Sequence, residues 1–250
     1  MKLPAAFLTR PITHRALHDK TDGRPENSIE AITAAIDAGY AIEIDLQLSK
    51  DGVPMVFHDY HLARLTAEQG PITMRTAAEL GQIPLSGGKA GIPTLAEVLA
   101  LVDGRVPLLI EIKDQDLNMG PNVGSLQQAT ADVLAGYAGD VAVMSFNPHA
   151  VIAFGEAAPH IPRGLVTSSY DPADWEPLAV DLCERLREIP DYDRTGASFI
   201  SHEAHDLDRP RVAELKAAGA NILCWTIKSA EEEAQARKIV DNVTFEGYLA

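Results

Sequence analysis

Eight short runs of apolar, mostly β-branched residues recur along this chain, with helix-like stretches between them. This alternation is typical of parallel strands joined by crossover helices, and a closed barrel of this kind has about eight strands. The candidate strands are AFLTRPITH, AIEIDLQLS, VPLLIEIK, VAVMSF, RGLVT, ASFIS, NILCWTI and NVTFEG. We therefore expect an α/β protein folded as a TIM-type (β/α)8 barrel.

The helix-like stretches cover residues 28–38, 122–137, 172–188, 209–218 and 229–239. Glycine follows the apolar pattern of two of them, at Gly39 and Gly219, as it commonly does where a helix ends. A chain of 250 residues suits one such barrel, so we expect a single domain over residues 1–250. Residues 51–94 carry Gly, Pro and polar residues without a strong strand or helix pattern, and we interpret them as an insertion after the second strand.

Charge and composition exclude some classes of partner. The net charge of -15 disfavours nucleic acid and anionic membranes, which need clustered Lys and Arg. The apolar start of the chain is interrupted by Pro4 and Arg10, so we expect neither a signal peptide nor a stable membrane insertion. Cys183 and Cys224 are too few for a disulfide framework and are expected to be reduced, which favours a cytoplasmic enzyme. The oligomeric state is not indicated.

Two predicted strands carry carboxylates on one face. In AIEIDLQLS, period two places Glu43 and Asp45 on the face opposite the apolar residues, and LLIEIK places Glu111 and Lys113 in the same way. The apolar face should meet the helices, so these charges should point into the barrel. Oxygen ligands of this kind suit one divalent cation, Mg²⁺ or Ca²⁺. The alternative is a set of buried ion pairs with Lys113 and Arg15 and no metal.

Two histidines stand out among the eight of the chain. His14 ends the first candidate strand beside Arg15, and His58 ends the segment after the second strand beside Asp59. Loops at the carboxyl ends of barrel strands hold the active sites of such enzymes. A histidine pair can supply one acid and one base near neutral pH. We interpret the remaining histidines as solvated or hydrogen-bonded residues.

Short motifs in this order resemble the glycerophosphodiester phosphodiesterases. They are HR at 14–15, PENS at 25–28, EIDLQLSKDGVPMVFHD at 43–59, EIK at 111–113, SFN at 145–147 and WTI at 225–227. The resemblance spans nearly the whole chain and implies a TIM-type barrel that hydrolyses glycerophosphodiesters to glycerol 3-phosphate and an alcohol. It also implies that a cyclic glycerol phosphate forms on the way.

The resemblance implies a role for each matching residue. His14 and His58 would be the acid and base, and Glu43, Asp45 and Glu111 would hold the metal. Arg15 and Lys113 would contact phosphate, Trp225 would wall the glycerol pocket, and Glu26 and Asn27 would support the site. Helix capping and core packing are the alternatives for the last three residues.

The sequence departs from the family pattern in a few places. Ala16 stands where the family usually has glycine, and a left-handed backbone there would be strained by Ala. The 16–24 loop is longer than usual, so His18, Asp19 or Lys20 could reach the leaving group. Two other functions stay open: a phospholipase D-like lipid phosphodiesterase on the same barrel, and a non-catalytic relative that binds a metal or ligand.

Overall fold

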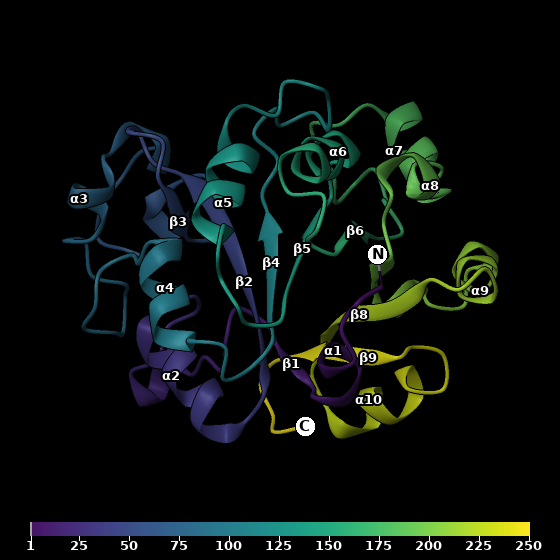
Figure 1. Cartoon of the computed structure of the whole chain (residues 1–250), viewed down its shortest axis with the longest axis horizontal. Coiled ribbons are helices and arrows are strands. Elements are labelled where there is room, and N and C mark those ends of the chain that lie inside the picture. The colour runs from purple at the N-terminus through teal and green to yellow at the C-terminus, as the bar shows by residue number, and fades with distance from the viewer. Residues whose placement is uncertain (1) are drawn as a thin grey trace.

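Eight parallel strands close into a barrel in the computed structural model, which describes residues 2–250 (Figure 1). Closure follows because β1 pairs with both β2 and β9. The barrel strands are β1 (Ile12–Thr13), β2 (Ala41–Leu48), β4 (Leu108–Ile112), β5 (Val141–Ser145), β6 (Arg163–Thr167), β7 (Phe199–Glu203), β8 (Asn221–Ile227) and β9 (Asn242–Phe245). The predicted TIM-type barrel is confirmed.

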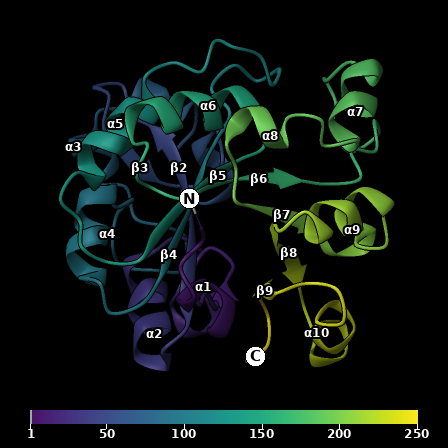
Figure 2. The ribbon, with the colours of Figure 1, turned by 45° about the vertical axis from the view of Figure 1, so that its right-hand side comes forward.

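Helices surround the barrel on its outside, as Figure 2 shows. They are α2 (Ile29–Ala38), α4 (Leu95–Val102), α5 (Leu126–Leu134), α6 (Pro148–Ala157), α7 (Val180–Arg187), α8 (Tyr192–Thr195), α9 (Pro210–Ala217) and α10 (Ala230–Ala236). Each of the five helix-like stretches holds a helix, although α5 and α7 begin later than expected. Two further helices were not predicted from the sequence. They are α4, which starts with a capping box at Thr94 and Glu97, and α6, which starts at Pro148 after the N-cap Asn147.

The amino-terminal segment corrects the prediction of a strand over AFLTRPITH. Its first part is the helix α1 (Ala6–Thr9), and the strand begins only at Ile12. Phe7 is fully buried. It packs with Leu3 and Ile12 in the apolar cluster that fills the barrel at the end where the strands begin. Asn242 of β9 donates its amide to the carbonyl of Phe7 at 2.7 Å. The apolar residues read as a strand therefore close the end of the barrel as a helical turn.

Alternation along β2 divides its side chains between two environments. Ile42, Ile44 and Leu46 join the apolar cluster shared with residues of α2 and α4. Glu43 and Asp45 point to the other side, into the barrel, and are buried there. Packing of the apolar face against helices thus forces two carboxylates into the interior.

Residues 51–94 lie at the side of the barrel, at the left in Figure 1. They contain β3 (Pro54–Val56), α3 (Ala77–Leu80) and two 3₁₀ turns, and they have a small apolar cluster of their own. β3 runs antiparallel to β2 with Leu46 opposite Val56, and the amide of Phe57 donates to the carbonyl of Asp45 at 2.9 Å. This hairpin returns the chain to the carboxyl end of β2, where His58 follows.

Two findings bear on the expected environment of the chain. Within residues 2–250, no helix has the length and apolar character needed to cross a bilayer. Cys183 and Cys224 are both buried and form no disulfide.

The packing of α1 gives a stability prediction. Replacing Phe7 with alanine should lower the free energy of unfolding by about 3–5 kcal/mol, because a buried aromatic side chain leaves a cavity. Thr9→Ala, at an exposed position of the same helix, is the matched control and should change it little. Urea denaturation measures both. A loss below about 1 kcal/mol for Phe7→Ala would show that α1 does not close the barrel.

Candidate active site

A small cavity of about 60 Å³ opens at the carboxyl ends of the barrel strands. Its lining residues are His14, Arg15, Glu43, His58, Glu111, Lys113, Met144, Phe146, Val166, Ser201, Trp225 and Thr244. Both histidines, both cationic residues and Trp225 singled out from the sequence therefore meet in one place. Asp45 joins them through an ion pair with Lys113.

Three buried carboxylates gather at one side of this cavity. Glu43, Asp45 and Glu111 each offer an oxygen, and these oxygens lie within 4.8 Å of one another. Burial, followed by the charges of Asp45 and Glu111, raises the pKa of Glu43 well above its usual range. Such crowding is relieved by a cation, and an all-oxygen donor set suits a hard divalent ion. The donor set therefore fits the predicted cation.

Lys113 already balances part of this negative charge. Its Nζ lies 2.7 Å from Asp45 Oδ1 and 2.7 Å from Glu111 Oε1. Burial opposes the ammonium charge, but the two carboxylates outweigh it and raise the pKa of Lys113. Burial likewise opposes ionisation of Asp45, yet Lys113 and the other cationic neighbours lower the pKa of Asp45. The ion pairs of the metal-free alternative are thus present, and Glu43 is the carboxylate that they leave uncompensated.

His14 is held by a carboxylate that the sequence reading missed. Its Nδ1 lies 2.6 Å from Glu246 Oε2, in the loop after β9. The carboxylate accepts from Nδ1, which leaves Nε2 as the nitrogen free for proton transfer. Burial lowers the pKa of His14 more than Glu246 raises it, which favours the neutral ring. Glu246 also lies 3.4 Å from His18 Nε2 and 3.2 Å from Lys228 Nζ.

His58 has a comparable partner in its neighbour Asp59. Nδ1 of His58 lies 2.6 Å from Asp59 Oδ1, and Arg64 binds both oxygens of the same carboxylate at 2.6 and 2.7 Å. Burial opposes ionisation of Asp59, but Arg64 and His58 outweigh it and hold the pKa of Asp59 well below its usual range. Arg64 was not predicted, because a lone arginine in the 51–94 segment carries no motif.

The PENS segment orients both cationic and acidic groups of the site. Glu26 accepts from Arg15 at 2.8 Å and from Arg64 at 2.8 Å. Asn27 donates to Asp45 Oδ2 at 2.9 Å and accepts from the amide of Asp45 at 3.2 Å. Ser28 is the residue that caps α2. The helix-capping alternative for Glu26 and Asn27 is therefore wrong, since both contact residues of the site.

Strained backbone surrounds these groups. Arg15, Ala16 and Asn27 have positive φ values of 52°, 66° and 59°. Ala16, which stands where the family usually has glycine, thus adopts the left-handed conformation that strains an alanine. Such conformations persist where surrounding contacts fix them, and here the amide of Arg15 donates to Glu43 Oε2 at 2.8 Å.

An aromatic wall extends from the cavity toward solvent. Phe146 lies between Trp225 and Trp175, with ring centroids 5.5 and 4.9 Å apart. Beyond it, a second cavity of about 420 Å³ is shared with His58 and is also lined by Tyr60, Met119 and Trp175. The 16–24 loop lines a different hollow of about 550 Å³ together with Glu246. The loop residues expected to reach the leaving group therefore lie on the Glu246 side, away from the aromatic cavity.

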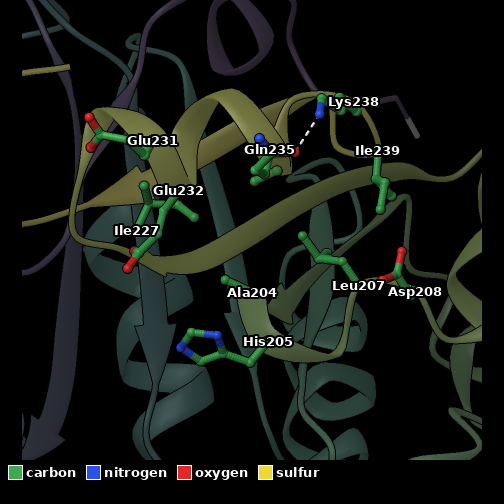
Figure 3. Close-up of a pocket in the computed structure, with 11 residues that line it drawn as sticks. Ala204, His205, Leu207, Asp208, Ile227, Glu231, Glu232, Gln235, Lys238 and Ile239 are labelled. Atoms are coloured by element: carbon green, nitrogen blue, oxygen red, sulfur yellow. Dashed lines mark hydrogen bonds between the residues drawn. The ribbon is translucent and has the colours of Figure 1, made fainter.

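A further groove lies away from the chemistry. It occupies about 480 Å³ between α10 and the segment after β7, where Figure 3 shows His205, Asp208 and Glu232 around it. None of the residues singled out from the sequence lines it. Glu231 and Glu232 come from the exposed face of α10 and Asp208 from the turn before α9, which is consistent with a solvated surface.

The parallel barrel and the groups at its carboxyl end define a phosphoric diester hydrolase of the TIM-barrel class. More specifically, the chain belongs to the glycerophosphoryl diester phosphodiesterase family, whose model matches residues 14–244. The resemblance stated from the motifs is confirmed.

Relatives are similar over most of the barrel. A glycerophosphodiester phosphodiesterase of Bacillus subtilis is 28% identical over 80% of this chain and 70% of its own length. One from Bacillus altitudinis is 30% identical over 64% of this chain and 67% of its own. A solved Oleispira antarctica phosphodiesterase, in complex with the product sn-glycerol-3-phosphate, shares 27% identity with a TM-score of 0.75, covering 96% of this chain and 94% of that one.

The contact between His14 and Glu246 gives a prediction about positioning. Glu246→Gln should lower kcat by at least about tenfold, because His14 loses the anion that fixes its tautomer and orientation. The acidic limb of the pH profile should move to lower pH, since Glu246 raises the pKa of His14. Steady-state rates over pH measure this.

The exposed Glu231, changed to Gln, is the matched control for that loss of charge. An unchanged rate and pH profile in Glu246→Gln would show that Glu246 does not act on His14.

Proposed function

We propose that this chain hydrolyses glycerophosphodiesters to glycerol 3-phosphate and an alcohol by acid–base catalysis with His14 and His58. The observation that supports this most is that both histidines line one cavity with Arg15, Lys113 and the carboxylate cluster. The test is release of glycerol 3-phosphate from glycerophosphocholine, with and without EDTA. Release that EDTA abolishes and Mg²⁺ or Ca²⁺ restores supports the proposal, and no release with either ion contradicts it.

One divalent cation, Mg²⁺ or Ca²⁺, is the proposed cofactor, held by Glu43, Asp45 and Glu111. When bound, it supplies positive charge to the phosphoryl oxygens as charge develops on them. Arg15 and Lys113 would contact the same oxygens from the protein. Because Lys113 lies 2.7 Å from two of the proposed ligands, it can keep their charge balanced when the cation is released.

The proposed reaction has two proton-transfer steps. In the first, one histidine accepts the proton of the glycerol 2-hydroxyl as that oxygen attacks phosphorus, and the other protonates the departing alcohol. The product is a cyclic glycerol phosphate, which water opens with the two roles reversed. Burial lowers the pKa of His14, and this shift toward the neutral ring favours His14 as the base of the first step.

The leaving alcohol is proposed to enter the aromatic cavity beside His58. This cavity is also the observation that favours a second candidate, a lipid phosphodiesterase, since Tyr60, Met119, Phe146 and Trp175 give it an apolar side beside the charged residues. Comparing kcat/KM for glycerophosphocholine and lysophosphatidylcholine separates the two candidates. We propose the soluble diester as the substrate, with no nucleic-acid partner, and a cytoplasmic location.

A carboxylate variant tests the cation site. Glu43→Gln should abolish divalent-ion binding and activity, measured by calorimetric titration and the phosphodiesterase assay. The metal-free variant should be at least as stable as the metal-free wild type, because repulsion among the carboxylates falls. Asp45→Asn is the contrasting variant, since it also breaks a buried ion pair with Lys113 and should destabilise the fold by about 3–5 kcal/mol. Full activity of Glu43→Gln in EDTA would contradict the metal assignment.

Histidine variants test the acid–base pair. His14→Ala and His58→Ala should each lower kcat by at least about 100-fold, with a much smaller effect on cation affinity. The losses should not add in the double variant, because the two groups act in the same steps. His160→Ala, at an exposed position, is the matched control. A near wild-type rate in either single variant would remove that histidine from the mechanism.

A further inference from the structure

Two hydroxyl groups in the cavity have no role in the reaction as proposed. Ser201 and Thr244 both line the cavity of the catalytic histidines, and their side chains are 0% and 1% exposed. Within residues 2–250, neither Ser201 Oγ nor Thr244 Oγ1 has a hydrogen-bond partner. A buried hydroxyl without a partner is destabilising, so a partner that enters the cavity is expected.

The fold places these hydroxyls on one wall. Along β7, period two puts Phe199 in the closed end of the barrel and Ser201 one layer nearer the site. Along β9, Asn242 contacts α1 and Thr244 lies one layer nearer the site. Trp225 comes from β8, the strand between them, and donates its Nε1 to the carbonyl of Ser201 at 3.0 Å. Ser201, Trp225 and Thr244 thus belong to three adjacent strands.

This wall differs in charge from the rest of the cavity. Its other lining groups are neutral, including Met144, Phe146 and Val166, whereas Arg15, Lys113 and the carboxylates come from the β1, β2 and β4 part of the barrel. The anionic phosphate belongs with the charged part. A neutral group that carries hydroxyls and a short carbon chain fits the Ser201, Trp225 and Thr244 wall.

We propose that Ser201 and Thr244 bind the terminal 1-hydroxyl of the glycerol group and so select glycerol among short diols. The proposal rests on the proposed function, in which the 2-hydroxyl is committed to attack on phosphorus beside a histidine and the 3-oxygen carries the phosphate. The 1-hydroxyl is then the polar group left for the neutral wall. Both protein hydroxyls can donate and accept, and a site built to hydrogen-bond a substrate hydroxyl rejects an analogue that lacks it.

The test compares glycerophosphocholine with its 1-deoxy analogue, the phosphocholine ester of propane-1,2-diol at the primary oxygen, which keeps the hydroxyl next to the phosphoester. Wild-type protein should prefer glycerophosphocholine in kcat/KM. Ser201→Ala and Thr244→Val should each reduce this preference by about 3- to 10-fold, because one hydrogen bond to the 1-hydroxyl is lost. Thr130→Val is the matched control, since Thr130 is also fully buried and unpartnered within residues 2–250 but lies in α5, outside the cavity.

Binding provides a readout that does not depend on turnover. Glycerol 3-phosphate should bind more tightly than propane-1,2-diol 1-phosphate in calorimetric titrations of the wild type, and the difference should shrink in Ser201→Ala and Thr244→Val. The proposal would be overturned if Ser201→Ala and Thr244→Val weakened the binding of both ligands equally and lowered kcat/KM equally for both substrates. The hydroxyls would then act only in packing. Absence of glycerophosphocholine hydrolysis would contradict the proposed function, while the binding comparison would still decide the role of the hydroxyls.

Discussion

The structure depends on placing three carboxylates inside the barrel beside one ammonium group. Packing of the apolar face of β2 against helices forces Glu43 and Asp45 inward, and Glu111 and Lys113 of β4 meet them there. Buried charges of this kind persist only when other groups compensate them. Asn27 and Arg15 are therefore held against β2, and the strained backbone near His14 belongs to the same arrangement. Burial and the two neighbouring carboxylates raise the pKa of Glu43, and the proposed cation would relieve this crowding.

Sequence patterns predicted the parts of the molecule that rest on local periodicity. Alternation in β2 and β4 was sufficient to predict the inward carboxylates, and the order of the motifs was sufficient to predict that His14 and His58 lie close together. The first part of the strand predicted over AFLTRPITH was wrong, because a short apolar run does not distinguish a strand from the helical turn of α1, which tertiary packing selects. Glu246 and Arg64 were missed since their roles arise from contacts with residues far away in the sequence, although a carboxylate just after the last strand was a usable signal.

The cavity divides the proposed chemistry between two sides. Charged residues line the side proposed for the phosphate, and each histidine is tied by Nδ1 to a carboxylate, which leaves its other ring nitrogen for the proposed proton transfers. Ser201, Trp225 and Thr244 form a neutral wall that suits the glycerol group. The cavity between these sides has about 60 Å³, and in the proposed reaction it would hold the substrate hydroxyl close to phosphorus. Orientation of this kind can give an effective molarity on the order of 10⁵ M or more.

The most direct measurement of the central claim is turnover of a substrate without the internal nucleophile. The 2-deoxy analogue of glycerophosphocholine keeps the phosphate and the 1-hydroxyl but has no hydroxyl placed to attack phosphorus. The account predicts that this analogue binds and inhibits but releases hardly any choline, while rapid quench with the natural diester detects a cyclic phosphate. Comparable choline release from both diesters, with no cyclic phosphate at any time, would contradict the account and indicate direct attack by water.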